Sequence, residues 1–205
     1  MLTLGQTPLI PVVSKVPTII LGMGALFGFP EQSDVPSIAG MEALLDFYTS
    51  LGKTKPDQII IFRDGVSESQ FNQVLIKLLR LASSLTRSGT LKIVVTVVQK
   101  TIIPSFFFQQ GSPDNVLHGT AIENKVCHPK NNDFYLGTHA GMIGITRKAH
   151  YHVLLDQAGF SADDLQEFVH SLSFMYQRST TAIFVVAPIC YSHLAASQLG
   201  AIYED

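Results

Sequence analysis

Three short apolar runs, rich in β-branched residues, constrain the fold of this chain most. They are Pro17–Met23 (PTIILGM), Gln58–Phe62 (QIIIF) and Lys92–Val98 (KIVVTVV). Runs of this length and composition are typical of strands buried on both faces, as in parallel sheets that are covered by helices. We therefore expect these segments to form the centre of a mixed α/β sheet.

The segments between these runs predict helices. Apolar residues recur at helical spacing over Met41–Leu51, and Gly52 is a plausible stop. Ser67 and Gln70 have the spacing of a capping box ahead of an apolar helix face at residues 71–79. A strand, a helix and a second strand in this order predict a βαβ unit, in which the two strands are parallel.

The second half of the chain predicts shorter elements. The expected strands are Thr120–Val126, Phe134–Thr138, His150–Leu155 and Ala182–Ala187. Ser161 and Asp164 form a second capping box, and Pro188 is expected to open a final helix that ends near Gly200. We find no internal repeat, and we expect an N-terminal tail over residues 1–16 and one domain over residues 17–205.

Composition limits the function classes. Hydrophobic residues make up 46% of the 205 residues, which is ample for a core and argues against disorder. The 14 Lys and Arg against 16 Asp and Glu give a net charge of −2. This balance argues mildly against tight, independent nucleic-acid binding, because affinity for phosphates comes largely from basic side chains.

The chain has neither a basic N-terminal region followed by an apolar run nor an apolar run of membrane-spanning length. Cys127 and Cys190 lack metal-ligand spacing and are expected to be free thiols in a reducing compartment. We therefore expect a soluble intracellular protein of the nucleus or cytoplasm that does not bind membranes.

Two expected strand ends carry polar residues. Asp64 follows QIIIF and Lys100 follows KIVVTVV, and ligands gather at the carboxyl ends of strands in open α/β sheets. Asp64 could hold a divalent cation and Lys100 could meet a phosphate. The simpler interpretation of Asp64 is that it caps the helix that follows.

Histidines offer a second candidate site. His150 and His152 would lie on one face of a strand, a geometry that can hold zinc. No third ligand stands at a convincing spacing, so ordinary hydrogen-bonded histidines are the simpler interpretation. His193, in the last expected helix, could equally be a core histidine.

Four longer segments are more specific than these patterns. They are residues 62–71 (FRDGVSESQF), 128–154 (HPKNNDFYLGTHAGMIGITRKAHYHVL), 160–180 (FSADDLQEFVHSLSFMYQRST) and 185–196 (VVAPICYSHLAA). They resemble Argonaute PIWI domains, and most of all those of plant Argonautes that act in small-RNA-directed DNA methylation. The resemblance implies an RNase H-like fold that holds a guide–target duplex and, in active members, cleaves the target RNA with magnesium.

The resemblance also implies that the cleavage set is incomplete. The family's Asp-Glu-Asp-His set clamps two metal ions against the scissile phosphate. Gly24 stands at the position of the first aspartate, while Asp64 and His193 match the second aspartate and the histidine. The segment with the glutamate and two antiparallel strands is missing after Ser37–Gly40, an internal deletion near residues 40–41. We expect a vestigial site without a cofactor, at which Asp64 would hold magnesium only if residual activity remains.

By the same resemblance, Lys100, His139, Arg147 and Arg178 would face the backbone of a guide RNA. Their alternative role is ordinary surface charge. The resemblance implies weak binding of a small guide RNA and its target RNA in gene silencing. The alternatives are a module that docks Gly-Trp-rich silencing proteins and a residual magnesium-dependent RNA endonuclease that uses Asp64 and His193.

The expected fold is thus an RNase H-like PIWI domain that lacks part of its antiparallel strands. Because those strands pair beside the first strand in the family, the edge of Pro17–Met23 would be exposed. An exposed apolar edge favours pairing with another chain. We therefore expect self-association unless another segment, such as Leu9–Val13, covers that edge.

Overall fold

The computed structural model describes residues 10, 12–24, 56–85, 91–100, 119–122, 132–138 and 148–203. Its elements are β1 (Thr18–Met23), β2 (Gln58–Asp64), η1 (Glu68–Gln70), α2 (Phe71–Leu85), β3 (Lys92–Gln99), β4 (Thr120–Ile122), β5 (Asp133–Gly137), β6 (Ala149–Asp156), α3 (Ala162–Ser173) and α4 (Ala187–Tyr203). Within the described residues, no helix combines the length and the apolar character needed to cross a membrane.

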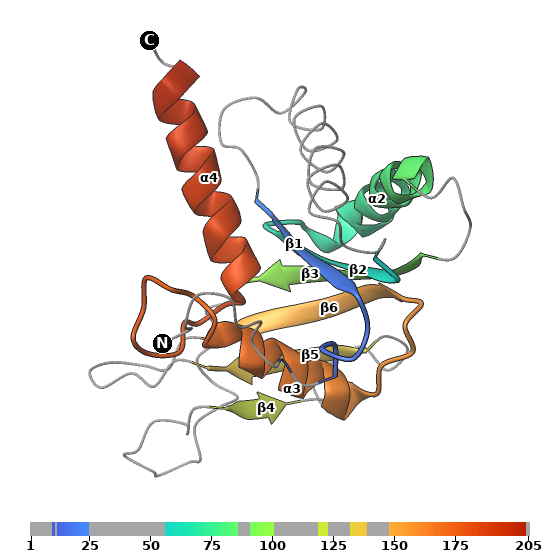
Figure 1. Ribbon diagram of the computed structural model, residues 1–205, viewed down its shortest axis with the longest axis horizontal. Coiled ribbons are helices and arrows are strands. Elements are labelled where there is room, and N and C mark those ends of the chain that lie inside the picture. Colours follow the sequence, from blue (N-terminus) through green and yellow to red (C-terminus); the bar gives the residue numbers. More distant parts are fainter. Residues whose placement is uncertain are drawn as a thin grey trace.

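The described strands form one sheet in the order β1-β2-β3-β6-β5-β4 (Figure 1). β1, β2 and β3 are parallel to one another, whereas β6, β5 and β4 continue the sheet with antiparallel pairing. The three expected central strands and the βαβ unit are confirmed. β-Branched side chains fit a pleated sheet that is buried on both faces, which explains why these runs form its parallel half.

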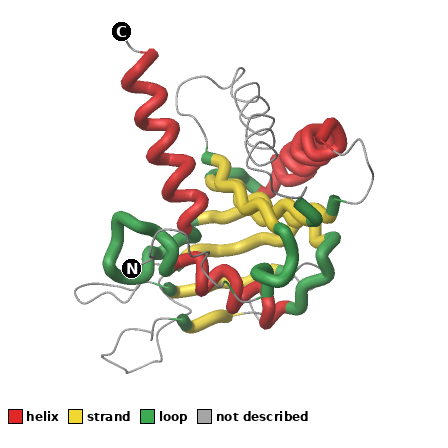
Figure 2. The backbone as a smooth tube through the Cα atoms, in the orientation of Figure 1, coloured by secondary structure: helices red, strands yellow, loops and turns green. Residues whose placement is uncertain are grey.

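Helices cover both faces of the sheet (Figure 2). On one face, Ile60 and Phe62 of β2 pack with α3 residues such as Phe168. On the other face, Ile59 and Ile61 pack with Leu78 of α2. The alternation of Ile59–Phe62 between two cores is the reason that this run carries no polar residue.

Local helix signals have mixed outcomes. The capping box of α3 is confirmed: Ser161 Oγ accepts from the backbone N–H of Asp164, and the Asp164 carboxylate accepts from the N–H of Ser161. The box expected at Ser67 is wrong, because its hydroxyl contacts the side chain of Gln70 and caps no backbone N–H. The helix expected over Met41–Leu51 lies outside the described residues.

The strand expected over Ala182–Ala187 is also wrong. Residues 182–186 form a buried connection, and the helix already begins at Ala187. Backbone groups of Ile183 bond outside any sheet: its N–H donates to the Ser173 carbonyl, and its carbonyl accepts from Thr138 Oγ1 at 2.5 Å. A buried connection needs apolar residues just as a buried strand does. An apolar run alone therefore does not reveal whether a neighbouring strand is available for pairing.

Two smaller boundaries differ from expectation. α4 begins one residue before Pro188 and continues past Gly200 to Tyr203, since a single glycine inside a helix costs only about 1 kcal/mol relative to alanine.

Among the described strands, β1 is terminal and pairs with β2 only. The position of the edge therefore agrees with expectation, while self-association through it stays a prediction.

The start of α4 lies directly against β1 at Gly22. A β-carbon built on Gly22 would lie 1.9 Å from the carbonyl oxygen of Pro188 and 2.7 Å from the backbone nitrogen of Ile189. Both atoms belong to the backbone, so no side-chain rotation can relieve the overlap. Glycine at this position therefore sets how closely the helix approaches the sheet.

We expect Gly22→Ala to lower the free energy of unfolding by about 3 kcal/mol, the upper part of the usual range for overpacking. Gly24→Ala is the matched control, because the three atoms nearest to a β-carbon there belong to the side chains of His193 and Ser192, at 3.3–3.4 Å. Urea unfolding of both variants measures the difference. Equal stability of Gly22→Ala and the wild type would show that α4 does not depend on this close approach.

Candidate nucleic-acid site

Asp64 and Lys100 lie at the carboxyl ends of two adjacent parallel strands. Asp64 is the last residue of β2, and Lys100 follows β3. Lys100 Nζ donates to Asp64 Oδ2 at 2.6 Å, and the side chains are 39% and 8% exposed, respectively. Both residues lie at strand ends, as the sequence predicted, and the fold brings their side chains together, so that this ammonium group neutralises a nearly buried carboxylate.

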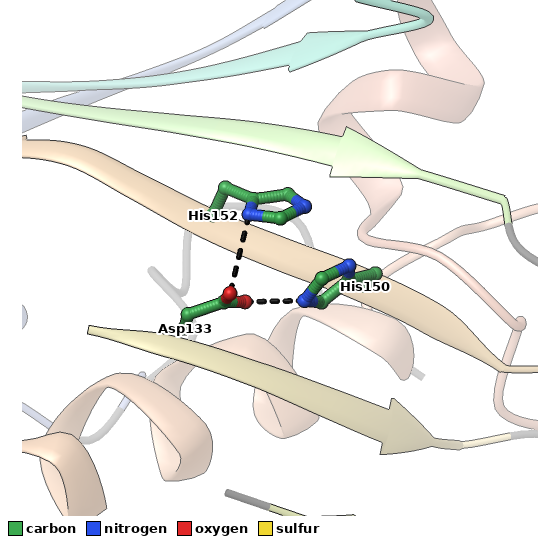
Figure 3. Close-up of side chains that lie close together, drawn as sticks. All are labelled: Asp133, His150 and His152. Carbon is green, nitrogen blue, oxygen red and sulfur yellow. Dashed lines mark ion pairs between the residues drawn. The ribbon is translucent and has the colours of Figure 1, made fainter. Parts of the chain in front are cut away.

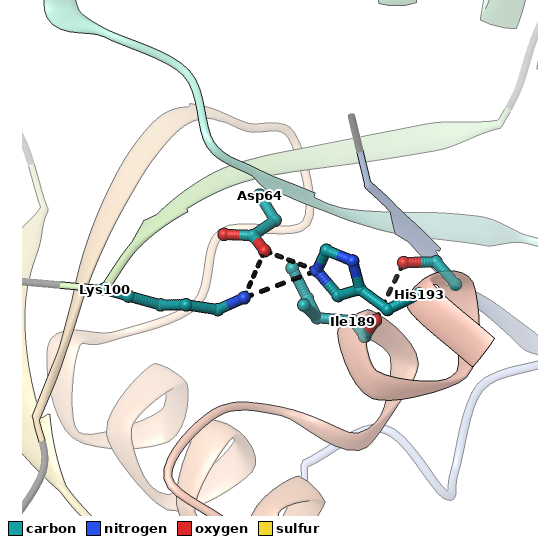
Figure 4. A network of polar contacts seen from close by, with 5 residues as sticks. Asp64, Lys100, Ile189 and His193 are labelled. Carbon is teal, nitrogen blue, oxygen red and sulfur yellow. Dashed lines mark hydrogen bonds and ion pairs between the residues drawn. The ribbon is translucent and has the colours of Figure 1, made fainter. Parts of the chain in front are cut away.

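His193 of α4 completes the cluster (Figure 4). Its Nε2 lies 2.6 Å from Asp64 Oδ2 and 3.3 Å from Lys100 Nζ. Nε2 can donate to the carboxylate or accept from the ammonium, but it cannot do both in one protonation state. The shorter distance favours donation to Asp64, so one carboxylate oxygen accepts from both partners. His193 is thus a member of this polar cluster and no core histidine.

Gly24 lies beside the same cluster. A β-carbon built on Gly24 would be 3.3 Å from His193 Cε1 and 3.4 Å from Ser192 Oγ. Ser192 Oγ donates to the Ile189 carbonyl within α4 at 2.8 Å. A side chain at position 24 would therefore start in contact with the imidazole that bonds Asp64.

The donors of this cluster do not fit a pair of magnesium ions. Such ions prefer oxygen ligands and need several closely placed anionic groups to clamp them against a phosphate. Among the described residues, Asp64 supplies the single carboxylate that contacts His193 and Lys100. An ammonium group 2.6 Å from its oxygen opposes the approach of a second cation.

Comparison with known proteins shows which family contains this chain. The Piwi domain family matches residues 40–204. The chain is 51% identical to protein argonaute 4 of Arabidopsis thaliana and 50% identical to protein argonaute 4A of rice (Oryza sativa subsp. japonica), over 100% and 98% of its length. The chain belongs to the Piwi domain family. It spans 27% of the length of each of these two relatives.

Solved structures show the same Piwi fold. The C-terminal lobe of a budding yeast Argonaute superposes with a TM-score of 0.68 at 24% identity, over 78% of this chain and 36% of that chain. Kluyveromyces polysporus Argonaute, crystallised with a guide RNA, gives a TM-score of 0.70 at 24% identity, over 82% of this chain and 23% of the other. The mixed sheet is consistent with the RNase H-like fold that the family resemblance implied.

The remaining candidate RNA contacts divide by where they lie. Arg178 is exposed in the connection between α3 and α4. His139 and Arg147 lie outside the described residues, as does Cys127. Within the described residues, Lys100 is the one candidate RNA contact that lies at the polar cluster. The described residues therefore do not bring the four candidate RNA contacts together on one surface.

Cys190 lies one turn before His193 in α4 and is a free cysteine. Burial raises the pKa of its thiol, and the Asp64 carboxylate raises it further, while the nearby Lys100 ammonium acts in the opposite direction. Burial also raises the pKa of Tyr151, which lies in the core below. Both groups are therefore neutral at physiological pH, and neither is an activated nucleophile.

A second polar cluster joins β5 and β6. Asp133 contacts His150 Nε2, and its Oδ2 lies 3.4 Å from His152 Nδ1 (Figure 3). Sequence reasoning identified the histidine pair but missed Asp133. Strand pairing was the missing information, because Asp133 lies directly opposite His152 in the β5–β6 register.

We expect Cys190 to react slowly with iodoacetamide, because the thiolate is the reactive form and its pKa is raised. A Cys127→Ser background leaves Cys190 as the single thiol. Adding Lys100→Met should slow alkylation further, since the cation that favours the thiolate is lost. Lys92→Met, at the far end of β3, is the matched control. Faster alkylation of the Lys100 variant, measured by mass spectrometry, would contradict this electrostatic assignment.

Proposed function

We propose that this Piwi domain binds RNA in small-RNA-guided gene silencing and does not cut it. Support comes from the 51% identity to a plant Argonaute over the whole chain. A structural relative, the Kluyveromyces polysporus Argonaute, was crystallised with a guide RNA. We assign to this chain the contact with the phosphate backbone of the RNA.

The observation that carries the non-cutting part is the Asp64–Lys100–His193 cluster beside Gly24. One carboxylate oxygen accepts from an ammonium and contacts an imidazole. The neighbouring position, at which the family resemblance implies an aspartate, has no side chain. Lys100 therefore supplies within the protein the positive charge that a metal ion would bring, and Asp64 and His193 have a structural role.

The same contact lowers the expected affinity for RNA. A cation adds to phosphate binding by releasing counterions, and Lys100 is already paired with Asp64 at 2.6 Å. The net charge of −2 provides no compensating field. We therefore propose weak binding that depends mainly on Arg178, with His139 and Arg147 as further contacts.

We expect no magnesium-dependent cut opposite the guide when the purified protein is incubated with guide RNA, matched target RNA and magnesium. The reason is that a two-metal centre needs more anionic ligands than Asp64 provides. Gly24→Asp adds a carboxylate beside His193, and we expect this variant to bind Mn²⁺ more tightly than the wild type by calorimetry. Gly24→Asn is the matched, uncharged control.

A site-specific cut by the wild type that Asp64→Ala abolishes would refute this proposal and favour a residual endonuclease. Equal Mn²⁺ affinities of the Asp and Asn variants would show that position 24 does not face the cluster. Both experiments use the full chain, and circular dichroism confirms that each variant is folded.

We expect RNA binding to fall with a shallow salt dependence. If three or four phosphates are neutralised, the log–log slope for single-stranded RNA is about −2 to −3. The triple variant His139→Ala, Arg147→Ala, Arg178→Ala should lose most of the binding. A control with three exposed lysines replaced by alanine (Lys15, Lys77 and Lys92) should retain it. Fluorescence anisotropy across a salt series measures both. Similar losses in the two triples would show that only overall charge matters and that these residues are ordinary surface cations.

A further inference from the structure

The polar cluster of Asp133, His150 and His152 lies in the antiparallel half of the sheet, on strands β5 and β6. All three residues are buried, at 6–7% exposure. His150 and His152 lie two residues apart in β6, so both side chains project from the same face (Figure 3). Asp133 reaches them from β5, where it pairs directly with His152.

The donor atoms of these residues have the spacing of metal ligands. One potential ligand atom from each residue lies within 4.8 Å of the other two. His152 Nδ1 and Asp133 Oδ2 are 3.4 Å apart, close to the roughly 3.3 Å that separates two ligands of a tetrahedral ion with bonds of about 2.0 Å. His150 Nε2 and Asp133 Oδ1 are in direct contact and would separate slightly around an ion.

Asp133 is negatively charged although it is buried. Burial raises the pKa of Asp133, but hydrogen bonds from His150 and His152 and the charge of the two rings outweigh this effect and hold it well below its usual range. The carboxylate is therefore anionic at neutral pH. His152 Nε2 is buried and has no hydrogen-bond partner among the described residues. The described residues thus leave one buried nitrogen of this cluster without a hydrogen bond.

Aromatic rings hold both imidazoles in place. Tyr135 stacks on His150 with ring centroids 3.8 Å apart, and Phe71 packs on His152 at 5.1 Å. Fixed rings reduce the reorganisation that binding requires, since preorganised ligands lose less freedom. Phe71 is the first residue of α2, so the cluster connects this helix with β5 and β6.

We propose that Asp133, His150 and His152 form a binding site for one divalent transition-metal ion of the zinc class. Two imidazoles and one carboxylate favour zinc over magnesium or calcium, which prefer oxygen ligands. With three protein ligands, a fourth position is left for water. The buried setting between two strands and the start of α2 gives the ion a structural role, clamping the antiparallel half of the sheet.

The test uses the full chain, purified without a histidine tag, in a Cys127→Ser, Cys190→Ser background that removes thiol ligands. After dialysis against a chelator, Zn²⁺ is added in calorimetry and Co²⁺ is added in absorption spectroscopy. We expect one ion per chain, the visible bands of a four-coordinate Co²⁺ site without thiolate charge transfer, and a higher melting temperature with Zn²⁺ because the folded state binds the ion.

Asp133→Asn and His152→Gln should each weaken Zn²⁺ binding at least tenfold and abolish the rise in melting temperature. Asp64→Asn is the matched control, because it removes a carboxylate from the other polar cluster and should leave Zn²⁺ binding unchanged. Circular dichroism checks that every variant folds. A chelator-treated protein that takes up no Zn²⁺ at equimolar concentration would overturn the proposal. Unchanged affinity in folded Asp133→Asn and His152→Gln would overturn it equally, leaving a hydrogen-bonded structural cluster.

Discussion

The contact between the start of α4 and β1 at Gly22 determines the geometry of much of this domain. The Pro188 carbonyl occupies the space in which any side chain at position 22 would begin. This approach brings α4 onto the parallel half of the sheet, so that His193, 129 residues from Asp64 in sequence, reaches its carboxylate. A shift of α4 away from the sheet would lengthen this 2.6 Å contact, so the packing of one backbone segment controls the polar cluster.

Buried charges need compensation, and the two clusters achieve it in different ways. Asp64 is neutralised by the half-exposed ammonium of Lys100. Asp133 contacts the imidazoles of His150 and His152. The Lys100 ammonium opposes the approach of a metal ion to Asp64, whereas two imidazoles and a carboxylate are ligands that suit an ion of the zinc class. This contrast is why we place the proposed zinc-class ion at the second cluster.

The two halves of the sheet follow different sequence rules. Strands β1, β2 and β3 are apolar on both faces because helices cover both, and their parallel pairing requires helical connections. β6 carries apolar Tyr151 and Val153 on one face and polar His150 and His152 on the other. Polar residues are tolerated in this buried antiparallel half because they bond across strands, as Asp133 and His152 do.

The sequence alone determined the central strands and the cap of α3, since each depends on neighbours within a few residues, and the order strand, helix, strand predicted the βαβ unit. It also located Asp64 and Lys100, because parallel strands end at the same edge of a sheet. The tertiary structure decided the rest. Residues 182–186 are as apolar as a strand but bond to Ser173 and Thr138 instead, and Asp133 joins His150 and His152 only through strand register. Hydrophobic period is a local property, whereas lateral pairing depends on segments distant in sequence, and only the folded chain brings these together.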